Sequence, residues 1–340
     1  MVRSAVPVVP PTAPEIPSLD GRAGGRRVSR RHGQPDRSCT SGGPAVSVPV
    51  AQGTEMVIHG RQLRRDRALI MAIVNRTPDS FYDQGATWHP EAAQAAIEHA
   101  VAAGADVVDL GGVPASPGPI VTVAEEIDRV RPTVVWARER FPELTLSIDT
   151  YRAEVVEALL AAGADLVNDS WAGWDDAILP VTARYGAGYV CAHTGGLTPR
   201  TDPVRPRYTD VMGDVIAVTT ALAERAVAAG VPPEGILLDP TIDFGKNTPQ
   251  SLEVLRTMPR LIATGWPVLL AMSNKGVVGE TLDVPLEGRL TGTLAATALA
   301  AAQGVAMVRA HQVEETRQTV EMVASVLGQR PPANAQRWMD

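Results

Sequence analysis

The sequence has 340 residues, with 31 basic and 38 acidic side chains and a formal net charge of -7. No basic block lies in the body of the chain, so the charge pattern gives no indication of a nucleic-acid partner. No apolar run approaches the roughly 20 residues that a membrane-spanning helix needs, which argues against a membrane protein. The two cysteines, Cys39 and Cys191, lie far apart without metal-ligand spacing, so a reducing cytoplasm is the expected location.

The first 54 residues differ in composition from the rest of the chain. They contain eight Pro and seven Arg among many Gly and Ser. Such a segment cannot bury enough apolar surface to offset the entropy that it would lose on ordering. We therefore predict a disordered tail over residues 1–54, one folded domain over residues 55–330 and a short C-terminal tail over residues 331–340.

Short apolar runs alternate with Ala-rich helical stretches over residues 68–327, a pattern typical of repeated βα units around a parallel sheet. A single eightfold β/α barrel needs roughly 250 residues, and an open doubly wound sheet is the competing architecture. Eight expected strands favour the α/β fold of the (β/α)8 TIM barrel. These strands are residues 69–74, 107–110, 144–148, 166–167, 188–192, 236–238, 268–272 and 305–308, with helices between them, for example at 91–103, 153–162 and 211–229.

A polar residue follows each expected strand. Because the active sites of such barrels lie at the carboxyl ends of the strands, these residues are candidates for one site. A single Asp or Asn more often caps a helix or stabilises a turn, but capping alone does not easily explain eight in series. The series comprises Asn75, Asp109, Asp149, Asn168, His193, Asp239, Ser273 with Lys275, and Arg309 with His311.

Four of these side chains match the edge of a flat heterocycle that carries amino, ring N–H and carbonyl groups. Asp149 and Asp239 supply acceptors, Asn168 supplies a donor and an acceptor, and Lys275 supplies an ammonium donor. Lys246 and Lys275 are the only lysines among 31 basic residues. Their retention where Arg is otherwise used favours site roles about as strongly as it favours chance.

Other strand-end residues suit negatively charged groups. Asn75, Arg309 and His311 are placed to meet an anion or a metal-bound oxyanion, since the planar Arg fork matches phosphate geometry. Ser273 precedes an expected helix N-terminus near Gly276, where a hydroxyl and backbone N–H groups bind a carboxylate. His193 is at least as often a structural residue at a strand end, so we leave it outside the catalytic set.

Eight short motifs, collinear along the barrel, resemble those of the dihydropteroate synthase family. Each motif alone is weak, but their order over the whole domain is specific. The motifs are NRTPDSF at 75–81, DLGG at 109–112, SIDT at 147–150, ND at 168–169, LLDP at 237–240, FGK at 244–246, SNK at 273–275 and RAH at 309–311.

The resemblance implies a transferase of folate biosynthesis that acts as a cytoplasmic homodimer. In the family reaction, p-aminobenzoate displaces pyrophosphate from 6-hydroxymethyl-7,8-dihydropterin pyrophosphate with the help of Mg²⁺. The implied roles are pterin binding by Asp149, Asn168, Asp239 and Lys275, pyrophosphate binding by Asn75, Arg309 and His311, a Mg²⁺ ligand at Asn75, p-aminobenzoate binding by Ser273 and Phe244, and catalysis by Asp109, Asp149 and Lys275.

The second loop departs from the family pattern. The family continues its GG with Glu-Ser-Thr-Arg-Pro-Gly, whereas Ala115 and Ser116 stand here at the Thr and Arg positions. A charge-assisted phosphate contact is worth about 1.5 to 3 kcal/mol, so its loss weakens pyrophosphate binding by tens of fold. The alternative prediction is therefore a weak or inactive paralogue that binds a pterin-like ligand. Arg76 is a candidate replacement cation, although a solvent-facing Arg is the commoner case.

Further features of the sequence bear on the pocket and on assembly. WAGW at 171–174 replaces a Ser-Gly-Gly-like turn, and its two Trp side chains either enter the pocket or pack in the barrel rim. Thr241, Ile242 and Asp243 stand where Gly or aromatic residues are usual, and Asn274 replaces an Arg. The apolar stretch 290–302 is either deeply buried or a subunit interface, and the resemblance favours the interface. A third functional hypothesis is a pterin-binding methyl-transfer domain that serves a corrinoid partner.

Overall fold

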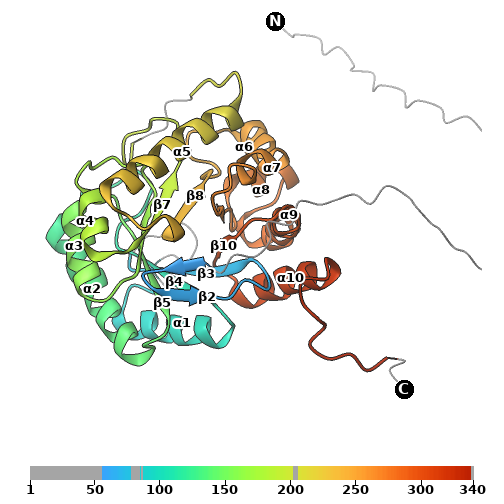
Figure 1. Cartoon of the computed structure of the whole chain (residues 1–340), viewed down its shortest axis with the longest axis horizontal. Coiled ribbons are helices and arrows are strands. Elements are labelled where there is room, and N and C mark those ends of the chain that lie inside the picture. Colours follow the sequence, from blue (N-terminus) through green and yellow to red (C-terminus); the bar gives the residue numbers. More distant parts are fainter. Residues whose placement is uncertain (1–55, 78–84, 86, 202–205, 338–340) are drawn as a thin grey trace, which may run out of the picture. The chain divides into compact units, whose positions relative to one another are not determined.

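Eight parallel strands lie at the centre of the structure, and helices surround them (Figure 1). The computed structural model describes residues 56–77, 85, 87–201 and 206–337, so the predicted tail over residues 1–54 lies outside the described residues. The barrel strands are β3 (Leu69–Asn75), β4 (Val107–Gly111), β5 (Thr145–Asp149), β6 (Leu166–Asp169), β7 (Gly188–Ala192), β8 (Ile236–Asp239), β9 (Leu269–Ala271) and β10 (Met307–Ala310).

The strands follow one another around the barrel in chain order, and β10 returns to pair with β3. The remaining seam joins β8 to the residues just before β9. There Leu238 forms a parallel bridge with Val268, and its N–H donates to the Pro267 carbonyl over 2.8 Å. The predicted TIM barrel is therefore confirmed, and the competing architecture, an open doubly wound sheet, is excluded.

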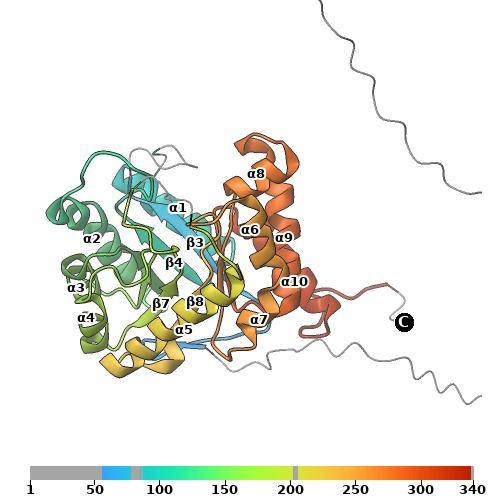
Figure 2. The same cartoon turned by 90° about the horizontal axis from the view of Figure 1, so that it is seen from above.

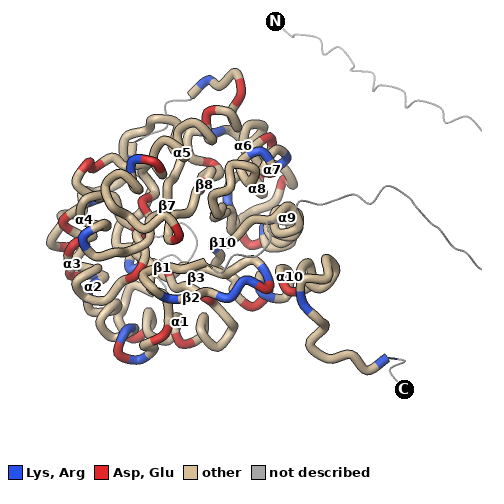
Figure 3. The backbone as a smooth tube through the Cα atoms, viewed as in Figure 1, with Lys and Arg blue, Asp and Glu red and all other residues tan. Residues whose placement is uncertain are grey.

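Helices lie on both sides of the strands when the barrel is viewed from above (Figure 2). Charged residues of both signs are interspersed along them (Figure 3). The helices are α1 (Pro90–Ala102), α2 (Val123–Arg140), α3 (Ala153–Ala161), α4 (Ile178–Tyr185), α5 (Val211–Ala229), α6 (Thr248–Arg256), α7 (Met258–Ile262), α8 (Gly276–Leu282), α9 (Leu290–Gln303) and α10 (Val313–Val326), with 3-10 turns at Pro233–Gly235 and Leu286–Gly288. Across the described residues, no helix combines the length and apolar character required to span a membrane.

The strands bury both of their faces, so their side chains form two separate apolar layers. Ile70 and Ala72 of β3 pack outward with the helices, whereas Leu69 and Met71 belong to the layer inside the barrel. A short antiparallel hairpin of β1 (Met56–Ile58) and β2 (Arg61–Leu63) precedes the barrel. Met56 and Ile58 join the inner layer near the strand starts, so the hairpin closes the amino end and leaves the carboxyl end for a ligand.

The second loop, residues 112–120, is tied to the loop that follows β7. Arg200 donates from Nε to the Ser116 carbonyl over 3.2 Å and from Nη1 to the Pro119 carbonyl over 2.8 Å. Its own backbone has a φ of +57°, which is uncommon for a residue other than glycine. One side chain thus fixes the loop that carries Ala115 and Ser116.

Arg200→Ala should release the second loop, because it removes two hydrogen bonds from a charged donor. We expect the amides of residues 112–120 to exchange hydrogen about tenfold faster, as measured by hydrogen–deuterium exchange with mass spectrometry. Arg184→Ala is the matched control, since Arg184 pairs with Glu157 at the surface and makes no contact with this loop. Unchanged exchange in Arg200→Ala would show that Arg200 does not hold the loop.

Candidate functional site

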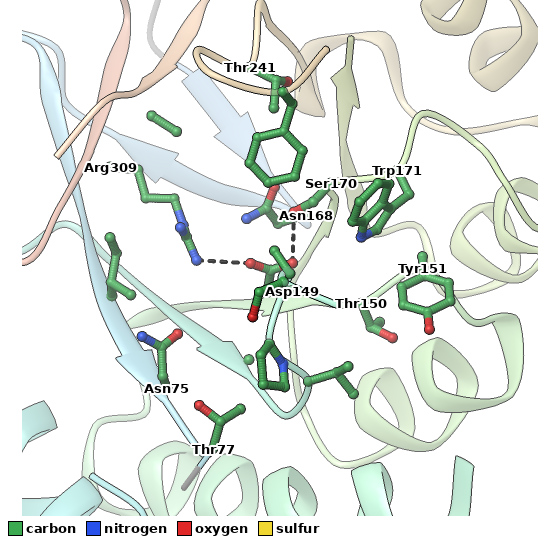
Figure 4. Close-up of a pocket in the computed structure, with 18 of the residues that line it drawn as sticks. Asn75, Thr77, Asp149, Thr150, Tyr151, Asn168, Ser170, Trp171, Thr241 and Arg309 are labelled. Carbon is green, nitrogen blue, oxygen red and sulfur yellow. Dashed lines mark hydrogen bonds and ion pairs between the residues drawn. The ribbon is translucent and has the colours of Figure 1, made fainter. Parts of the chain in front are cut away.

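A pocket opens at the carboxyl end of the barrel, where the sequence predicts a site (Figure 4). Among the described residues, every barrel strand or its following loop contributes to the lining except β7 and its loop. The predicted residues that line the pocket are Asn75, Asp149, Asn168, Asp239, Phe244, Ser273, Lys275, Arg309 and His311.

A buried network of two carboxylates and one guanidinium underlies this pocket. Arg309 donates from Nε to Asp109 over 2.7 Å and from Nη2 to Asp149 over 2.9 Å. Asp109 also accepts from Ser147 Oγ over 2.6 Å and from Asn168 Nδ2 over 2.9 Å. Strand register explains the arrangement, because Asp109 is paired with Ser147, and Asp149 with Asn168.

Asp109 is fully buried and does not belong to the pocket lining. Its carboxylate oxygens are occupied by Ser147, Asn168 and Arg309. The structure therefore places Asp109 behind the site, where it orients Asn168 and Arg309, and its predicted catalytic role stays a prediction.

Asp149 lies at the centre of the pocket, between Arg309 and Ser170 (Figure 4). Ser170 Oγ donates to Asp149 Oδ1 over 2.7 Å. Burial raises the pKa of Asp149 to about 6, the Arg309 charge opposes that shift, and the Asp109 charge adds to it. Its carboxylate is therefore ionised at neutral pH and becomes protonated in mild acid.

Asp239 and Lys275 approach the pocket from neighbouring strand ends. Asp239 Oδ1 accepts from the Thr241 N–H over 2.8 Å, and burial raises its pKa against the opposing charge of Lys275. Lys275 Nζ donates to the Ile242 carbonyl over 2.5 Å and lies 5.1 Å from the centre of the Phe244 ring. Burial lowers the pKa of Lys275, and Asp239 raises it. The pair offers one acceptor and one donor side by side.

The three residues that the family resemblance implies for pyrophosphate, Asn75, Arg309 and His311, offer little positive charge to an anion. Burial and the charge of Arg309 lower the pKa of His311 to about 3, so this imidazole is neutral at pH 7. His311 Nδ1 lies 3.1 Å from Ser273 Oγ, and its backbone N–H donates to the same oxygen over 3.2 Å. Asn75 lies on the same side of Asp149 as Arg309 (Figure 4). Arg309 is thus the one cation of this group, and it is already paired with two carboxylates.

The second loop adds no charge to the pocket. It contributes Val113, Pro114, Ala115 and Ser116 to the lining. Among the described residues, the cations that line the pocket are Lys275 and Arg309. The wall at which the family carries Thr and Arg is therefore uncharged.

Arg76 does not replace the missing cation. Its side chain is buried, with Nε donating to the Arg129 carbonyl over 3.0 Å and Nη1 to the Trp88 carbonyl over 2.5 Å. It does not line the pocket. Both expectations for this residue were wrong, since it faces neither the phosphate region nor the solvent.

Sequence reasoning missed several lining residues, among them Glu126, Tyr151 and Ser170. Glu126 lies in the first turn of α2, is buried, and accepts from Arg152 over 2.8 Å, while burial raises its pKa. Ser170 and Tyr151 each follow a predicted strand-end residue by two positions, which is a signal that would have found them. Glu126 carries no such signal, because an acidic residue in a first helical turn is ordinary.

His193 and Lys246 are structural. His193 is fully buried with Nε2 2.7 Å from Asp214, and burial lowers its pKa to about 4. Lys246 Nζ donates to the carbonyls of His193, Thr241 and Phe244 over 3.0 to 3.2 Å. Thr241 and Asp243 have positive φ values of 48° and 70°, so these bonds hold a tightly turned loop that presents Phe244.

A divalent cation has few ligands here. Within the described ranges, no group of three or more His, Cys, Asp or Glu residues is placed to hold a metal ion. Asn75 supplies one amide oxygen, whereas Mg²⁺ prefers six oxygen ligands, several of them water or substrate phosphate. The described residues alone therefore do not supply a ligand set for a resident magnesium ion.

Comparisons with known proteins agree with this geometry. The family model described as pterin binding enzyme matches residues 71–311. The Mycobacterium bovis protein named inactive dihydropteroate synthase 2 is 57% identical over 282 residues, which cover 82% of this chain and 89% of that protein. The Clostridium beijerinckii dihydropteroate synthase is 36% identical over 260 residues, with 76% and 93% covered.

A solved structure shows the same fold. The crystal structure of the Yersinia pestis dihydropteroate synthase with a sulfonamide drug complex has a TM-score of 0.77 and 33% identity, and the match covers 82% of this chain and 100% of that one. The family match begins in β3 and ends at His311, so it includes each strand end that lines the pocket. The chain therefore belongs to the dihydropteroate synthase family of pterin-binding enzymes.

Proposed function

We propose that this chain is a catalytically weak or inactive dihydropteroate synthase paralogue that binds a pterin-type ligand. The observation that carries the proposal is the uncharged wall formed by Val113, Pro114, Ala115 and Ser116, which stands beside the side chains expected to bind the pterin. We call these side chains the floor; they are Asp149, Asn168, Asp239 and Lys275. The comparisons support the proposal. The Mycobacterium bovis relative that is named inactive is 57% identical to this chain, whereas the Clostridium beijerinckii relative that is named dihydropteroate synthase is 36% identical.

The floor is suited to the edge of a pterin. Asp149 and Asp239 can accept hydrogen bonds from amino and ring N–H groups. The Asn168 amide can donate and accept, and Lys275 can donate to a ring carbonyl or nitrogen. Asn168 is fixed by its bond to Asp109 and Lys275 by its bond to the Ile242 carbonyl, so both are positioned before a ligand arrives. A preorganised donor and acceptor set loses less entropy on binding.

The leaving group is poorly supported. In the family reaction the arylamine nitrogen forms a C–N bond, the C–O bond to pyrophosphate breaks, and the amine loses a proton. Of the three residues implied for the pyrophosphate, Arg309 carries the positive charge, whereas Asn75 and the neutral His311 carry none. A Mg²⁺ ion, which would neutralise part of the charge, would bind largely through the phosphate oxygens. Ser273 and Phe244 remain the proposed contacts of p-aminobenzoate.

The proposal includes a homodimer in the cytoplasm. α9 buries Thr293, Thr297 and Ala300 against the barrel but leaves Leu299 67% exposed. On α10, Met322 is 64% and Val326 71% exposed. Large apolar side chains exposed on adjacent helices are typical of a subunit interface and support the interface reading of this region.

Restoring the family residues tests the proposal. With the pterin pyrophosphate, p-aminobenzoate and Mg²⁺, we expect the wild-type protein to release little or no pyrophosphate. The double variant Ala115→Thr, Ser116→Arg should raise the rate by about tenfold to a hundredfold, because it returns a charge-assisted phosphate contact.

Ile120→Arg is the matched control, since it adds a cation to the same loop at a position that is 87% exposed and outside the pocket lining. Its rate should equal that of the wild type. Wild-type turnover at the rate of an active family member would disprove the proposal, as would a double variant that is no faster than the wild type.

Pterin binding should depend on pH through Asp149. Its pKa is raised to about 6, so the carboxylate accepts hydrogen bonds at pH 7.5 and loses this ability as the pH falls through 6. Affinity for 6-hydroxymethylpterin should then fall about tenfold per pH unit below 6, as followed by pterin fluorescence. Asp149→Asn should bind more weakly and lack this step, whereas a constant wild-type affinity from pH 7.5 to 5 would refute the role of Asp149.

A further inference from the structure

Two buried polar side chains line the pocket with an unpaired atom each, and we call Thr77 and Glu126 the polar pair. Thr77 is 2% exposed, and the side chain of Glu126 is 1% exposed. Within the described part of the chain, neither Thr77 Oγ1 nor Glu126 Oε1 has a hydrogen-bond partner, yet both residues line the pocket. A buried polar atom without a partner is costly, so the pair indicates a place where a bound group completes the site.

Arg152 occupies only one oxygen of Glu126. Its Nη1 donates to Glu126 Oε2 over 2.8 Å, while its Nη2 donates to the Tyr151 hydroxyl over 3.1 Å. The guanidinium also lies 5.0 Å from the centre of the Tyr151 ring. Burial raises the pKa of Glu126, whereas the nearby Thr150 hydroxyl and the charge of Arg152 lower it. Arg152 therefore balances the charge of Glu126, and Oε1 remains available as an acceptor.

The surrounding structure holds both members of the polar pair. The Arg76 N–H donates to the Gly111 carbonyl over 2.7 Å, so the ends of β3 and β4 fix the backbone just before Thr77. The second loop packs closely on Glu126, since a Cβ at Gly112 would lie 3.0 Å from Glu126 Cγ and 2.7 Å from Val130 Cγ2. The pair is therefore positioned before a ligand arrives, which reduces the entropy lost on binding.

The polar pair lies beside the floor. Figure 4 shows Thr77 beyond Asn75, on the side of Asp149 away from Asn168. Burial is the main cause of the raised pKa of Asp149, and the charge of Glu126 adds to it, which indicates that the two carboxyl groups lie near each other. A side chain on a heterocycle that binds at Asp149 can therefore extend to the pair.

The hydrogen-bonding capacity of the polar pair matches a hydroxyl group. Glu126 Oε1 accepts, whereas the Thr77 hydroxyl both donates and accepts. A ligand hydroxyl donates to Glu126 and accepts from Thr77 at the same time. An ionised phosphate has no hydrogen for Glu126, an ammonium has no acceptor for Thr77, and an apolar chain leaves both atoms unpaired.

We propose that the polar pair binds the hydroxyl groups of an uncharged aliphatic side chain on the pterin-type ligand. This inference rests on the proposed function, because the heterocycle must bind to the floor before its side chain reaches Thr77 and Glu126. The ligand class is a polyhydroxyalkyl pterin, which differs in charge from the pyrophosphate that the family uses as substrate. Thr77 and Glu126 then determine specificity for the side chain.

The test compares 6-propylpterin with 6-(1,2,3-trihydroxypropyl)pterin, which differ only in the hydroxyl groups of a three-carbon chain. By calorimetry on the full-length protein, the wild type should bind the tighter of the two erythro triols at least about tenfold more tightly, the size of one neutral hydrogen bond plus one to a charged group. Glu126→Met removes both oxygens at similar length and should reduce this preference to about threefold or less. Glu125→Met is the matched control, since Glu125 is the preceding residue, is 48% exposed and does not line this pocket, and it should retain the full preference.

Thr77→Val keeps the shape of the side chain and removes its hydroxyl, which provides a second measurement if Glu126→Met does not fold. The preference should fall by about threefold or more, without weaker binding of 6-propylpterin. Equal or weaker binding of the triol by the wild type, as expected if water alone serves the pair, would overturn the inference. So would the full preference in a folded Glu126→Met or in Thr77→Val. 6-Methylpterin has no such chain and reports on the floor alone, so its failure to bind the wild type would instead refute the proposed function.

Discussion

The ion-pair network of Asp109, Arg309 and Asp149 is the interaction on which the pocket depends. Asp109 and Arg309 lie 200 positions apart in the sequence, and barrel closure between β3 and β10 brings them within 2.7 Å. A buried carboxylate is tolerated only when it is paired and hydrogen-bonded, and Asp109 meets this condition with three donors. Removing any donor would leave a buried charge only partly compensated, so the network fixes Asn168 and Arg309 together.

The same network limits how strongly the pocket can attract an anion. Arg309 donates hydrogen bonds to two carboxylates, which reduces the positive charge that it presents to an anion. His311 is neutral, and the second loop carries no charge where it lines the pocket. In the proposed function, binding of the heterocycle and expulsion of the leaving group therefore depend on different residues. A chain that keeps the first set and loses the second retains the fold and the floor without efficient turnover.

Much of the fold and of the pocket was predictable from the sequence, because parallel strands in one barrel direct their carboxyl ends to one edge. That constraint alone predicts that Asp149, Asn168 and Asp239 lie together. The orientation of Arg76 was not predictable, since its acceptors are backbone carbonyls of other loops and helices. The burial of Trp171 and the exposure of Trp174 were also not predictable. They depend on a turn in which the backbone N–H groups of Trp171 and Gly173 donate to the Asp169 carboxylate. The β1–β2 hairpin was missed, because strands of three residues are too short to show a periodic pattern.

The central claim is that the floor binds a pterin while the anion side of the pocket contributes little. Calorimetry with 6-hydroxymethyl-7,8-dihydropterin and then with its pyrophosphate, both with Mg²⁺, measures the two parts separately. We expect both ligands to bind with affinities within about threefold of each other, since a charge-assisted phosphate contact would contribute at least about tenfold. A pyrophosphate that binds about a hundredfold more tightly than the alcohol would contradict this account.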